Sequence, residues 1–276
     1  MNTTVLTTDH PAWIETTDGQ RVRLVRSGPG LWLASWGHDE LQLRCVEGSE
    51  DVKPLSLTTD PGTLPDSVPD ELRLGLHQLG PTQRLANPWL WDAMVTAILR
   101  QVVRAGQARR LYRTWCATYG TTVQTTDGAF AVTPDARQVL ALEDDAFAAV
   151  GAKFHRTALQ AAARAYLEHE AAWVQLAPAD LVPALINIPR VGPWTAAAAA
   201  SDFTGDFTLY PHADLAVRTW AARIAPAYAW PESEKEFNQR WRRMAGPSDQ
   251  HLHTLTLTTL TWGAHARTTG DTGNRS

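Results

Sequence analysis

The chain has 276 residues, of which 44% are hydrophobic and 20% charged, so it can bury the core of one large domain or two small ones. The net charge of −4 is uneven: six Lys or Arg stand against twelve Asp or Glu up to residue 80, and nineteen against seventeen after it. Two distant cysteines, the lack of a bilayer-length apolar run and the lack of a signal sequence argue against a disulfide scaffold, a membrane protein and a secreted protein; we expect a cytoplasmic one.

The N-terminal part has the pattern of strands. From Gln20 to Val46 apolar and polar residues alternate, and glycines and a proline mark turns. This predicts an antiparallel sheet. The proline-rich stretch from Asp51 to Asp70 reads as an irregular connector, and helical patterns dominate after it. We therefore expect a β-rich domain over 1–80, a helical domain over 81–267 and a flexible tail over 268–276.

Residues typical of helix starts and ends mark several helices after residue 80. Asn87 is a good N-cap with Pro88 at the first helical position, and apolar residues up to Val102 follow at helical spacing. Gly106 suggests the break before a second helix, and Gly120 suits a left-handed stop after it. Further helices are predicted at Glu143 to Val150, Thr157 to Trp173, Ala179 to Leu185, Pro193 to Ser201, Asp214 to Ile224, Glu232 to Met244 and Gln250 to His265.

The segment L-I-N-I-P-R-V-G-P-W-T-A, from Leu185 to Ala196, predicts a tight turn that opens a helix at Pro193. Backbone N–H groups from Gly192 to Thr195 would then point out at the positive end of the helix dipole, where a phosphate oxygen can bind. Taken alone, the segment is a weak signal, because an ordinary corner between two helices is the more common interpretation of such a stretch.

With Asp214 following one helix later, this segment resembles the hairpin of the helix-hairpin-helix (HhH-GPD) DNA glycosylase superfamily, and most of all its 3-methyladenine DNA glycosylase II branch. Three further stretches match in order, at Ala97 to Val103, Ala108 to Tyr112 and Gly151 to Arg156. The resemblance covers roughly residues 79–265. It implies a mainly α fold (α+β overall), with a helix-hairpin-helix glycosylase domain and a small N-terminal antiparallel β domain.

The resemblance implies that Asp214 is the catalytic carboxylate. Hydrolysis of an N-glycosidic bond develops positive charge on the sugar, which a fixed carboxylate stabilises, and the same group can orient the attacking water. Locally, Asp214 also reads as an N-cap, and both roles are compatible. Asp202 and Asp206 are interpreted as loop or surface residues before the catalytic position.

Trp194 occupies the position where bifunctional relatives carry a lysine that forms a Schiff base. None of the three lysines of this chain lies in the hairpin, so the resemblance implies a monofunctional enzyme without AP lyase activity. An indole there would attract a flipped base made cationic by alkylation, although packing in the core is the plainer role for a tryptophan. The residues assigned to the base pocket are Trp194, Gln101, Tyr210 and Trp262. Aromatics of the 3-methyladenine branch are replaced by Ala198 and Leu215, which puts its pocket shape in doubt.

DNA contacts are assigned by the same resemblance. Val102 would be the wedge that fills the gap left by the flipped base, although valine is short for this task. The expected DNA-binding residues are Val102, Arg104, Arg190, Val191, Gly192 and Thr195. Arg190 stands where the family has a glycine, so the turn must accept a side chain. Gln101 contacts a base or, alternatively, satisfies backbone groups at a helix break.

No cofactor is expected to be required. The endonuclease III branch holds an iron–sulfur cluster with four cysteines near its C-terminus, whereas this chain has no cysteine after Cys116. No metal-binding side chains are assigned. The resemblance does imply that a monovalent cation can bind hairpin carbonyls, here those of Ile186, Ile188 and Val191.

These inferences predict a monomeric, nucleoid-associated enzyme of base excision repair. It would remove flipped-out alkylated bases, of the 3-methyladenine type, from double-stranded DNA and leave an abasic site. Two alternatives remain open: a protein of the same fold that binds damaged or bent DNA without catalysis, and a glycosylase for oxidised or bulky lesions.

Overall fold

The computed structural model describes residues 4–271, and these fall into two compact units that interleave along the chain. The first unit comprises 4–9, Ser56–Leu85 and 206–271, and the second comprises His10–Leu55 and Ala86–Gly205. Neither unit ends at residue 80, where the sequence suggested a domain boundary. The reason is strand pairing, because β6 (Ser56–Thr59) pairs with β7 (Thr82–Leu85), which lies beyond residue 80.

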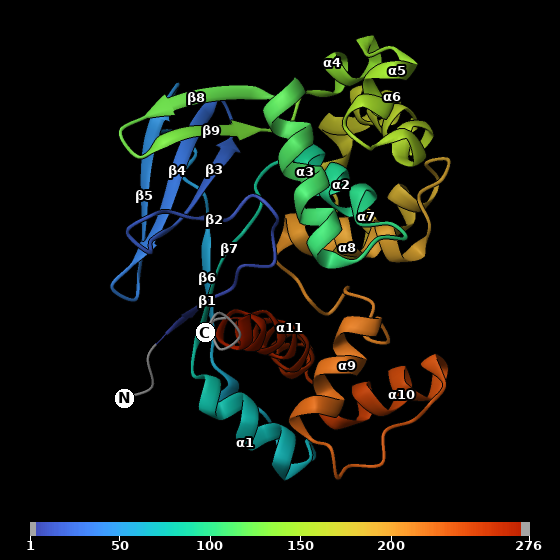
Figure 1. Cartoon of the computed structure of the whole chain (residues 1–276). Helices are drawn as coiled ribbons and strands as arrows, with labels where there is room; N and C mark the ends of the chain where they lie inside the picture. Colours follow the sequence, from blue (N-terminus) through green and yellow to red (C-terminus); the bar gives the residue numbers. More distant parts are fainter. Residues whose placement is uncertain (1–3, 272–276) are drawn as a thin grey trace. The chain divides into compact units, whose positions relative to one another are not determined.

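The N-terminal sheet belongs to the second unit. Its four antiparallel strands follow in the order β2 (Ile14–Glu15), β3 (Arg21–Ser27), β4 (Gly30–Gly37) and β5 (Glu40–Glu47) (Figure 1). The alternating apolar residues on β3 and β4 are buried, as the period-two pattern requires. The sheet predicted over residues 20–46 is therefore confirmed.

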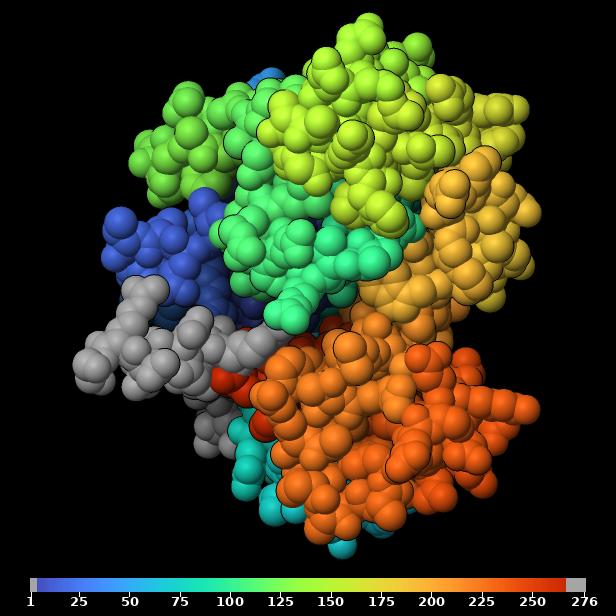
Figure 2. Space-filling model, turned by 45° about the vertical axis from the view of Figure 1, so that its right-hand side comes forward, coloured from blue at the N-terminus to red at the C-terminus, as the bar shows by residue number. Residues whose placement is uncertain are grey.

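A second hairpin was not predicted from the sequence. Strands β8 (Thr121–Thr125) and β9 (Gly128–Val132) place Val123, Phe130 and Val132 in one buried cluster with apolar residues of β3 and β4. Its tip lies on the surface, as the space-filling view also shows (Figure 2). Gly120, which precedes it, is extended rather than left-handed as predicted (φ −81°), and it must be glycine because a Cβ there would collide with the carbonyl oxygen of Val132.

Seven α-helices complete the second unit in the described part of the chain, and most of them agree with the predicted spans. They are α2 (Leu90–Leu99), α3 (Ala105–Tyr119), α4 (Ala136–Ala141), α5 (Asp144–Ala149), α6 (Arg156–Trp173), α7 (Pro178–Ile186) and α8 (Pro193–Thr204). Every residue of α2 is buried, and α2 packs against α8.

The predicted start of α2 was wrong. The helix begins at Leu90 with Trp89 as its N-cap residue, and Pro88 lies outside it. The side-chain oxygen of Asn87 accepts the N–H of Trp89 at 3.4 Å, and its amide donates to Asp92 (3.1 Å) and Asp202 (2.8 Å). Gly106 likewise lies inside α3, and the break between the two helices falls at residues 100–104.

The first unit has a three-stranded sheet, in the order β1 (Val5–Leu6), β7 and β6, and four α-helices within the described residues. The helices are α1 (Asp70–Leu79), α9 (Leu215–Ile224), α10 (Glu234–Ala245) and α11 (Asp249–Asp271). Strand β6 lies within the stretch that was read as an irregular connector. Helix α11 continues through the first four residues of the expected tail, and 272–276 lie outside the described residues.

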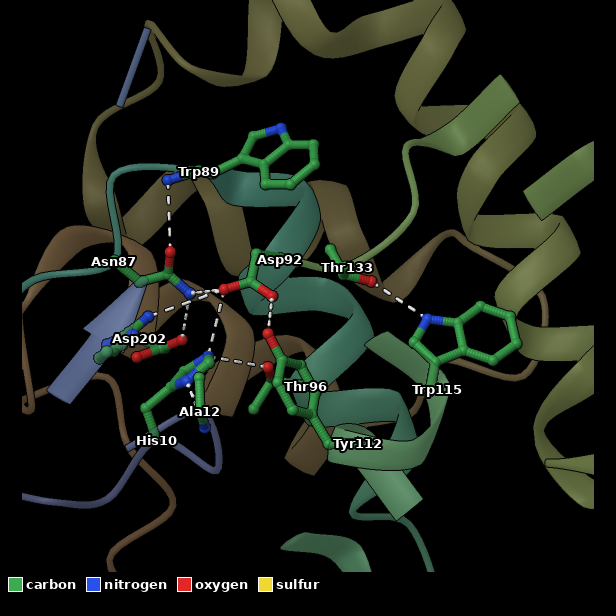
Figure 3. A network of polar contacts seen from close by, with 11 residues as sticks. His10, Ala12, Asn87, Trp89, Asp92, Thr96, Tyr112, Trp115, Thr133 and Asp202 are labelled. Atoms are coloured by element: carbon green, nitrogen blue, oxygen red, sulfur yellow. Dashed lines mark hydrogen bonds and ion pairs between the residues drawn. The ribbon is translucent and has the colours of Figure 1, made fainter. Parts of the chain in front are cut away.

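A buried polar network links α2 to the other parts of the second unit (Figure 3). The carboxylate of Asp92 accepts the Tyr112 hydroxyl at 2.6 Å and lies 3.2 Å from Nε2 of His10. Burial alone would raise the pKa of Asp92, but His10, Arg23 and Tyr112 together lower it below its usual value. The network therefore keeps a buried carboxylate charged in the middle of the unit.

Within residues 4–271, no helix is both long enough and apolar enough to cross a membrane.

Candidate active site

Asp214 stands immediately before α9 and caps it. Its Oδ2 accepts a hydrogen bond from the backbone N–H of Ala216 at 3.3 Å, and its own N–H donates to the carbonyl of Pro211 at 2.9 Å. The carboxylate is half-buried, at the positive end of the helix dipole. The N-cap role read from the sequence is confirmed, and it fixes where the carboxylate lies.

A tyrosine holds the same carboxylate. The hydroxyl of Tyr210 donates to Oδ2 of Asp214 at 3.1 Å, and its ring is buried and stacks on Phe207 with 5.8 Å between centroids. Sequence reasoning proposed Tyr210 as a wall of the base pocket. In the structure its hydroxyl contacts the carboxylate, which makes it a group able to orient Asp214.

The hairpin between α7 and α8 has the backbone that the sequence implied. Arg190 is left-handed (φ 69°), so the turn accepts a side chain where glycine would be unstrained. Gly192 is the N-cap residue of α8, Pro193 is its first residue, and no side chain caps this helix start. The first turn of α8 is thus a suitable site for an anion, in keeping with the phosphate interpretation.

Gln101 connects the turn after α2 to this hairpin. Its Nε2 donates to the carbonyl of Arg190 at 3.1 Å and to Oγ1 of Thr195 at 2.9 Å. Thr195 is buried, so its hydroxyl faces Gln101 rather than solvent. These contacts correspond to the structural alternative raised for Gln101, because the amide satisfies polar groups of a neighbouring loop.

The next residue, Val102, is exposed and strained. Its side chain is 87% exposed, and its backbone is left-handed (φ 60°), a conformation that β-branched residues rarely adopt. Such strain costs on the order of 1–3 kcal/mol and is commonly found at functional positions. The residue before it, Gln101, is bonded through its side chain to Arg190 and Thr195.

His155 was missed as part of this site. It is buried, and its Nε2 lies 3.2 Å from the carbonyl oxygen of Gln101. Burial lowers its pKa, which keeps the ring neutral and Nε2–H able to donate. The stretch from Gly151 to Arg156 was noted in the sequence, but a contact over 54 positions gives no local signal.

Trp194 lies in the first turn of α8 and is half-buried. The guanidinium of Arg100, the last residue before the turn of Gln101, stands 5.4 Å from the centroid of its ring. Four residues further along α8, Ala198 is buried and contributes only a methyl group. The sequence did not indicate the pairing of Arg100 with Trp194.

The remaining predicted residues occupy different environments. Arg104 and Arg190 are exposed, whereas the side chain of Val191 is buried. Trp262 packs against Trp220 with 6.4 Å between ring centroids.

Asp202 and Asp206 differ from each other. Asp206 accepts from the N–H and hydroxyl of Thr208, as expected of a turn residue. The reading of Asp202 as a loop residue was wrong, because it lies in α8 and accepts the amide of Asn87.

Among the described residues, His, Cys, Asp and Glu side chains nowhere gather in groups of three or more that could hold a metal ion. In the hairpin, the carbonyl of Ile188 accepts the N–H of Val191 at 3.0 Å.

Comparisons with known proteins connect these features. No family profile and no curated protein matches the sequence. Solved structures match in fold. A 3-methyladenine DNA glycosylase from Archaeoglobus fulgidus has a TM-score of 0.71 and 14% identity, covering 92% of this chain and 90% of the other.

Two further structures cover 95% of this chain and 90% of their own. They are MBOgg1 in complex with a low-affinity DNA ligand (TM-score 0.70, 13% identity) and the 8-oxoguanine glycosylase/lyase of Clostridium acetobutylicum in complex with double-stranded DNA (0.68, 12% identity). The chain has the mainly α fold, with an N-terminal β region, of the helix-hairpin-helix DNA glycosylases.

Proposed function

We propose that this protein is a monofunctional DNA glycosylase that hydrolyses the N-glycosidic bond of a damaged base in double-stranded DNA. The observation that carries the proposal is the carboxylate of Asp214, which is fixed at the start of α9 by Ala216 and Tyr210 in a chain with a glycosylase fold. Two structures of the same fold are named as glycosylases, for 8-oxoguanine and for 3-methyladenine. Two structures of this fold are complexes with DNA.

Asp214 would act on the sugar. Breaking the bond to the base leaves an oxocarbenium-like sugar, and a carboxylate held in place stabilises that charge without reorganising. The same oxygens can orient the water that adds to the sugar carbon. Tyr210, bonded to Oδ2, limits the carboxylate to one orientation.

The hairpin and the turn after α2 would hold the DNA. Backbone N–H groups at the uncapped start of α8 suit a phosphate oxygen. Val102, exposed and held in a strained turn, is suited to enter the space left by the extruded base. Arg104 and Arg190 add exposed positive charge nearby in the sequence.

The monofunctional character rests on Trp194. A lyase step needs an amine that forms a Schiff base with the sugar, and the hairpin and α8 contain no lysine. The product would be an intact strand with an abasic site. Among damaged bases, alkylated purines follow from the resemblance to the 3-methyladenine branch, and oxidised bases are the substrates named for two structures of the same fold.

The test is base release from dimethyl-sulfate-treated duplex DNA and from duplexes that contain hypoxanthine or 8-oxoguanine, followed by chromatography and by strand breakage with and without alkali. We expect release of at least one damaged base with breaks that require alkali, and a loss of about 10²–10³-fold in Asp214→Asn. Asp206→Asn is the matched control, because that carboxylate accepts the N–H and hydroxyl of Thr208 and has no part in the proposed reaction, so this variant should keep native activity.

Two results would reject the proposal. DNA binding without release of any tested base would favour the non-catalytic binder, and equal release by the native protein and Asp214→Asn would remove Asp214 from the mechanism. Breaks without alkali, together with borohydride trapping of a covalent complex, would show a lyase.

A further inference from the structure

We infer that His253 is a positioning residue for Asp214, because as a neutral imidazole it anchors the segment 207–214 that carries the carboxylate. The observation that carries the inference is a hydrogen bond in which the backbone N–H of Phe207 donates to Nδ1 of His253 at 3.2 Å. His253 lies near the start of α11, on an element remote from Asp214 in sequence. Asp214 is the reacting group of the proposed function, so the catalytic part of the inference rests on that proposal.

This hydrogen bond fixes the protonation state of His253. A backbone N–H can only donate, so Nδ1 must be an unprotonated acceptor and the neutral ring must carry its proton on Nε2. Nε2 then donates to Oγ1 of the buried Thr59, which lies 3.2 Å away on β6. Both ring nitrogens are therefore used, one by β6 and the other by the segment that leads to Asp214.

The surroundings of His253 favour the neutral ring. Burial lowers the pKa of His253, Asp206 opposes this change, and Arg84 on β7 adds to it. Arg84 forms an ion pair with Asp9 at 3.0 Å and holds its guanidinium 4.9 Å from the centroid of the Phe207 ring. A protonated His253 would turn an N–H towards the N–H of Phe207, so the hydrogen bond between them would be lost.

Ring contacts connect this anchor to the carboxylate. The buried ring of Phe207 packs edge-on against His253, with 6.0 Å between centroids, and stacks on Tyr210 at 5.8 Å. The hydroxyl of Tyr210 in turn donates to Oδ2 of Asp214 at 3.1 Å. A shift of Phe207 therefore moves the ring that orients the carboxylate, and small displacements of a reacting group cost much of the rate.

Two substitutions separate the acceptor from the bulk of the ring. His253→Asn keeps an oxygen near the position of Nδ1 that can accept the N–H of Phe207, and it cannot titrate. His253→Leu fills similar space without an acceptor. We expect His253→Leu to lower kcat for base release about tenfold with KM unchanged, because the N–H of Phe207 loses its partner. His253→Asn should stay within about threefold of the native kcat.

His251→Asn is the matched control. His251 lies in the same turn of α11, but its Nδ1 is 3.3 Å from the carbonyl oxygen of Ala245, so its loss should leave kcat and its pH dependence native. In the native protein kcat should fall when the pH drops far enough below 6.5 to protonate His253, and in His253→Asn this fall should move to lower pH.

Two readouts on the free protein need no substrate. Nitrogen-15 NMR of the histidine rings should show His253 with its proton on Nε2 at pH 7. Hydrogen exchange should show the Phe207 amide less protected in His253→Leu than in the native protein and His253→Asn.

A proton on Nδ1 at pH 7, or native protection of the Phe207 amide in His253→Leu, would overturn the inference. Equal losses of kcat in the two His253 variants would reject it as well, since the ring would then act only by packing, and so would an unshifted pH dependence in His253→Asn. If the native protein releases no base, the proposed function fails, while NMR and hydrogen exchange still decide whether His253 anchors the segment.

Discussion

Tyr210 and Asp214 lie four residues apart in the segment before α9 and are joined by a hydrogen bond of 3.1 Å from the tyrosine hydroxyl to Oδ2 of the carboxylate. The same oxygen accepts the N–H of Ala216 at 3.3 Å, so both bonds converge on one side of the carboxylate. These two bonds fix the orientation of the carboxylate at the start of α9.

Tyr210→Phe removes the hydroxyl and keeps the ring that stacks on Phe207. A hydrogen bond to a charged group contributes about 1.5–3 kcal/mol, so we expect kcat for base release to fall roughly tenfold while KM stays unchanged. Single-turnover and steady-state kinetics measure the two quantities. A change in KM with native kcat would mean that Tyr210 contacts the base rather than positions Asp214.

Gln101→Glu tests the link between the α2–α3 turn and the hairpin. The substitution replaces the donating amide with an acceptor that faces the carbonyl of Arg190 and the hydroxyl of Thr195. We expect the free energy of unfolding to fall by about 1–3 kcal/mol and the affinity for undamaged duplex DNA to fall as well. Denaturant unfolding and fluorescence anisotropy measure these effects.

Gln101→Leu provides the comparison, because it deletes the donors without adding charge. Native stability in both variants would show that the turn and the hairpin are held by other contacts.

Val102→Gly separates strain from function. Glycine adopts a left-handed φ without cost, so the variant should unfold with equal or slightly higher stability than the native protein. Base release from duplex DNA should nevertheless fall, since no side chain would fill the gap beside the extruded base.

Release from single-stranded DNA provides the control for Val102, because no base pair has to be opened there. If Val102→Gly loses activity equally on both substrates, the residue is not a wedge.

The sequence predicted those parts of the fold that local patterns encode. Alternation over residues 20–46 produced β3 to β5, and helical spacing with glycine and proline signals located most helices. The hairpin β8–β9 was not predicted, because its buried residues form one cluster with those of β3 and β4. Contacts between segments so far apart in sequence leave no local periodicity. The division of the chain into two interleaved units was not predicted for the same reason, because β6 pairs with β7, which follows helix α1 in the sequence.

For the candidate site, the resemblance identified Asp214, Trp194 and the hairpin, whose roles stay predictions. What the sequence could not show is how side chains are shared between distant segments. His155 reaches Gln101, and Arg100 reaches Trp194, over separations where spacing carries no information. The residues that hold or modify a site are therefore harder to predict than those that perform the chemistry.

Asn87→Asp tests the buried polar network. Asn87 donates from one amide to both Asp92 and Asp202, so an aspartate would place three carboxylates together in the interior of the second unit (Figure 3). An uncompensated buried charge costs about 3–5 kcal/mol, and we expect a loss of unfolding free energy of that order at pH 7.

Asn87→Ser serves as the milder comparison, since it deletes the bridging amide without a new charge. A stability loss no larger than that of Asn87→Ser would mean that the introduced carboxyl is neutral.

The last prediction concerns pH. His212 is buried, its Nδ1 lies 3.1 Å from the side-chain oxygen of Asn238, and burial lowers its pKa to about 4, with a smaller contribution from Arg242. In the unfolded chain a histidine titrates near 6.5, so between about pH 6.5 and 4 the unfolded state binds more protons than the folded state. The contribution of His212 to the free energy of unfolding is therefore fully present above pH 6.5. It is lost as the pH drops towards 4, and the loss amounts to up to roughly 3 kcal/mol.

His212→Phe keeps an aromatic ring but cannot titrate, so its unfolding free energy, measured by denaturant at pH 7 and pH 5, should change less than that of the native protein. Parallel losses in the two proteins would assign the pH dependence to other groups, such as His253, whose pKa burial also lowers.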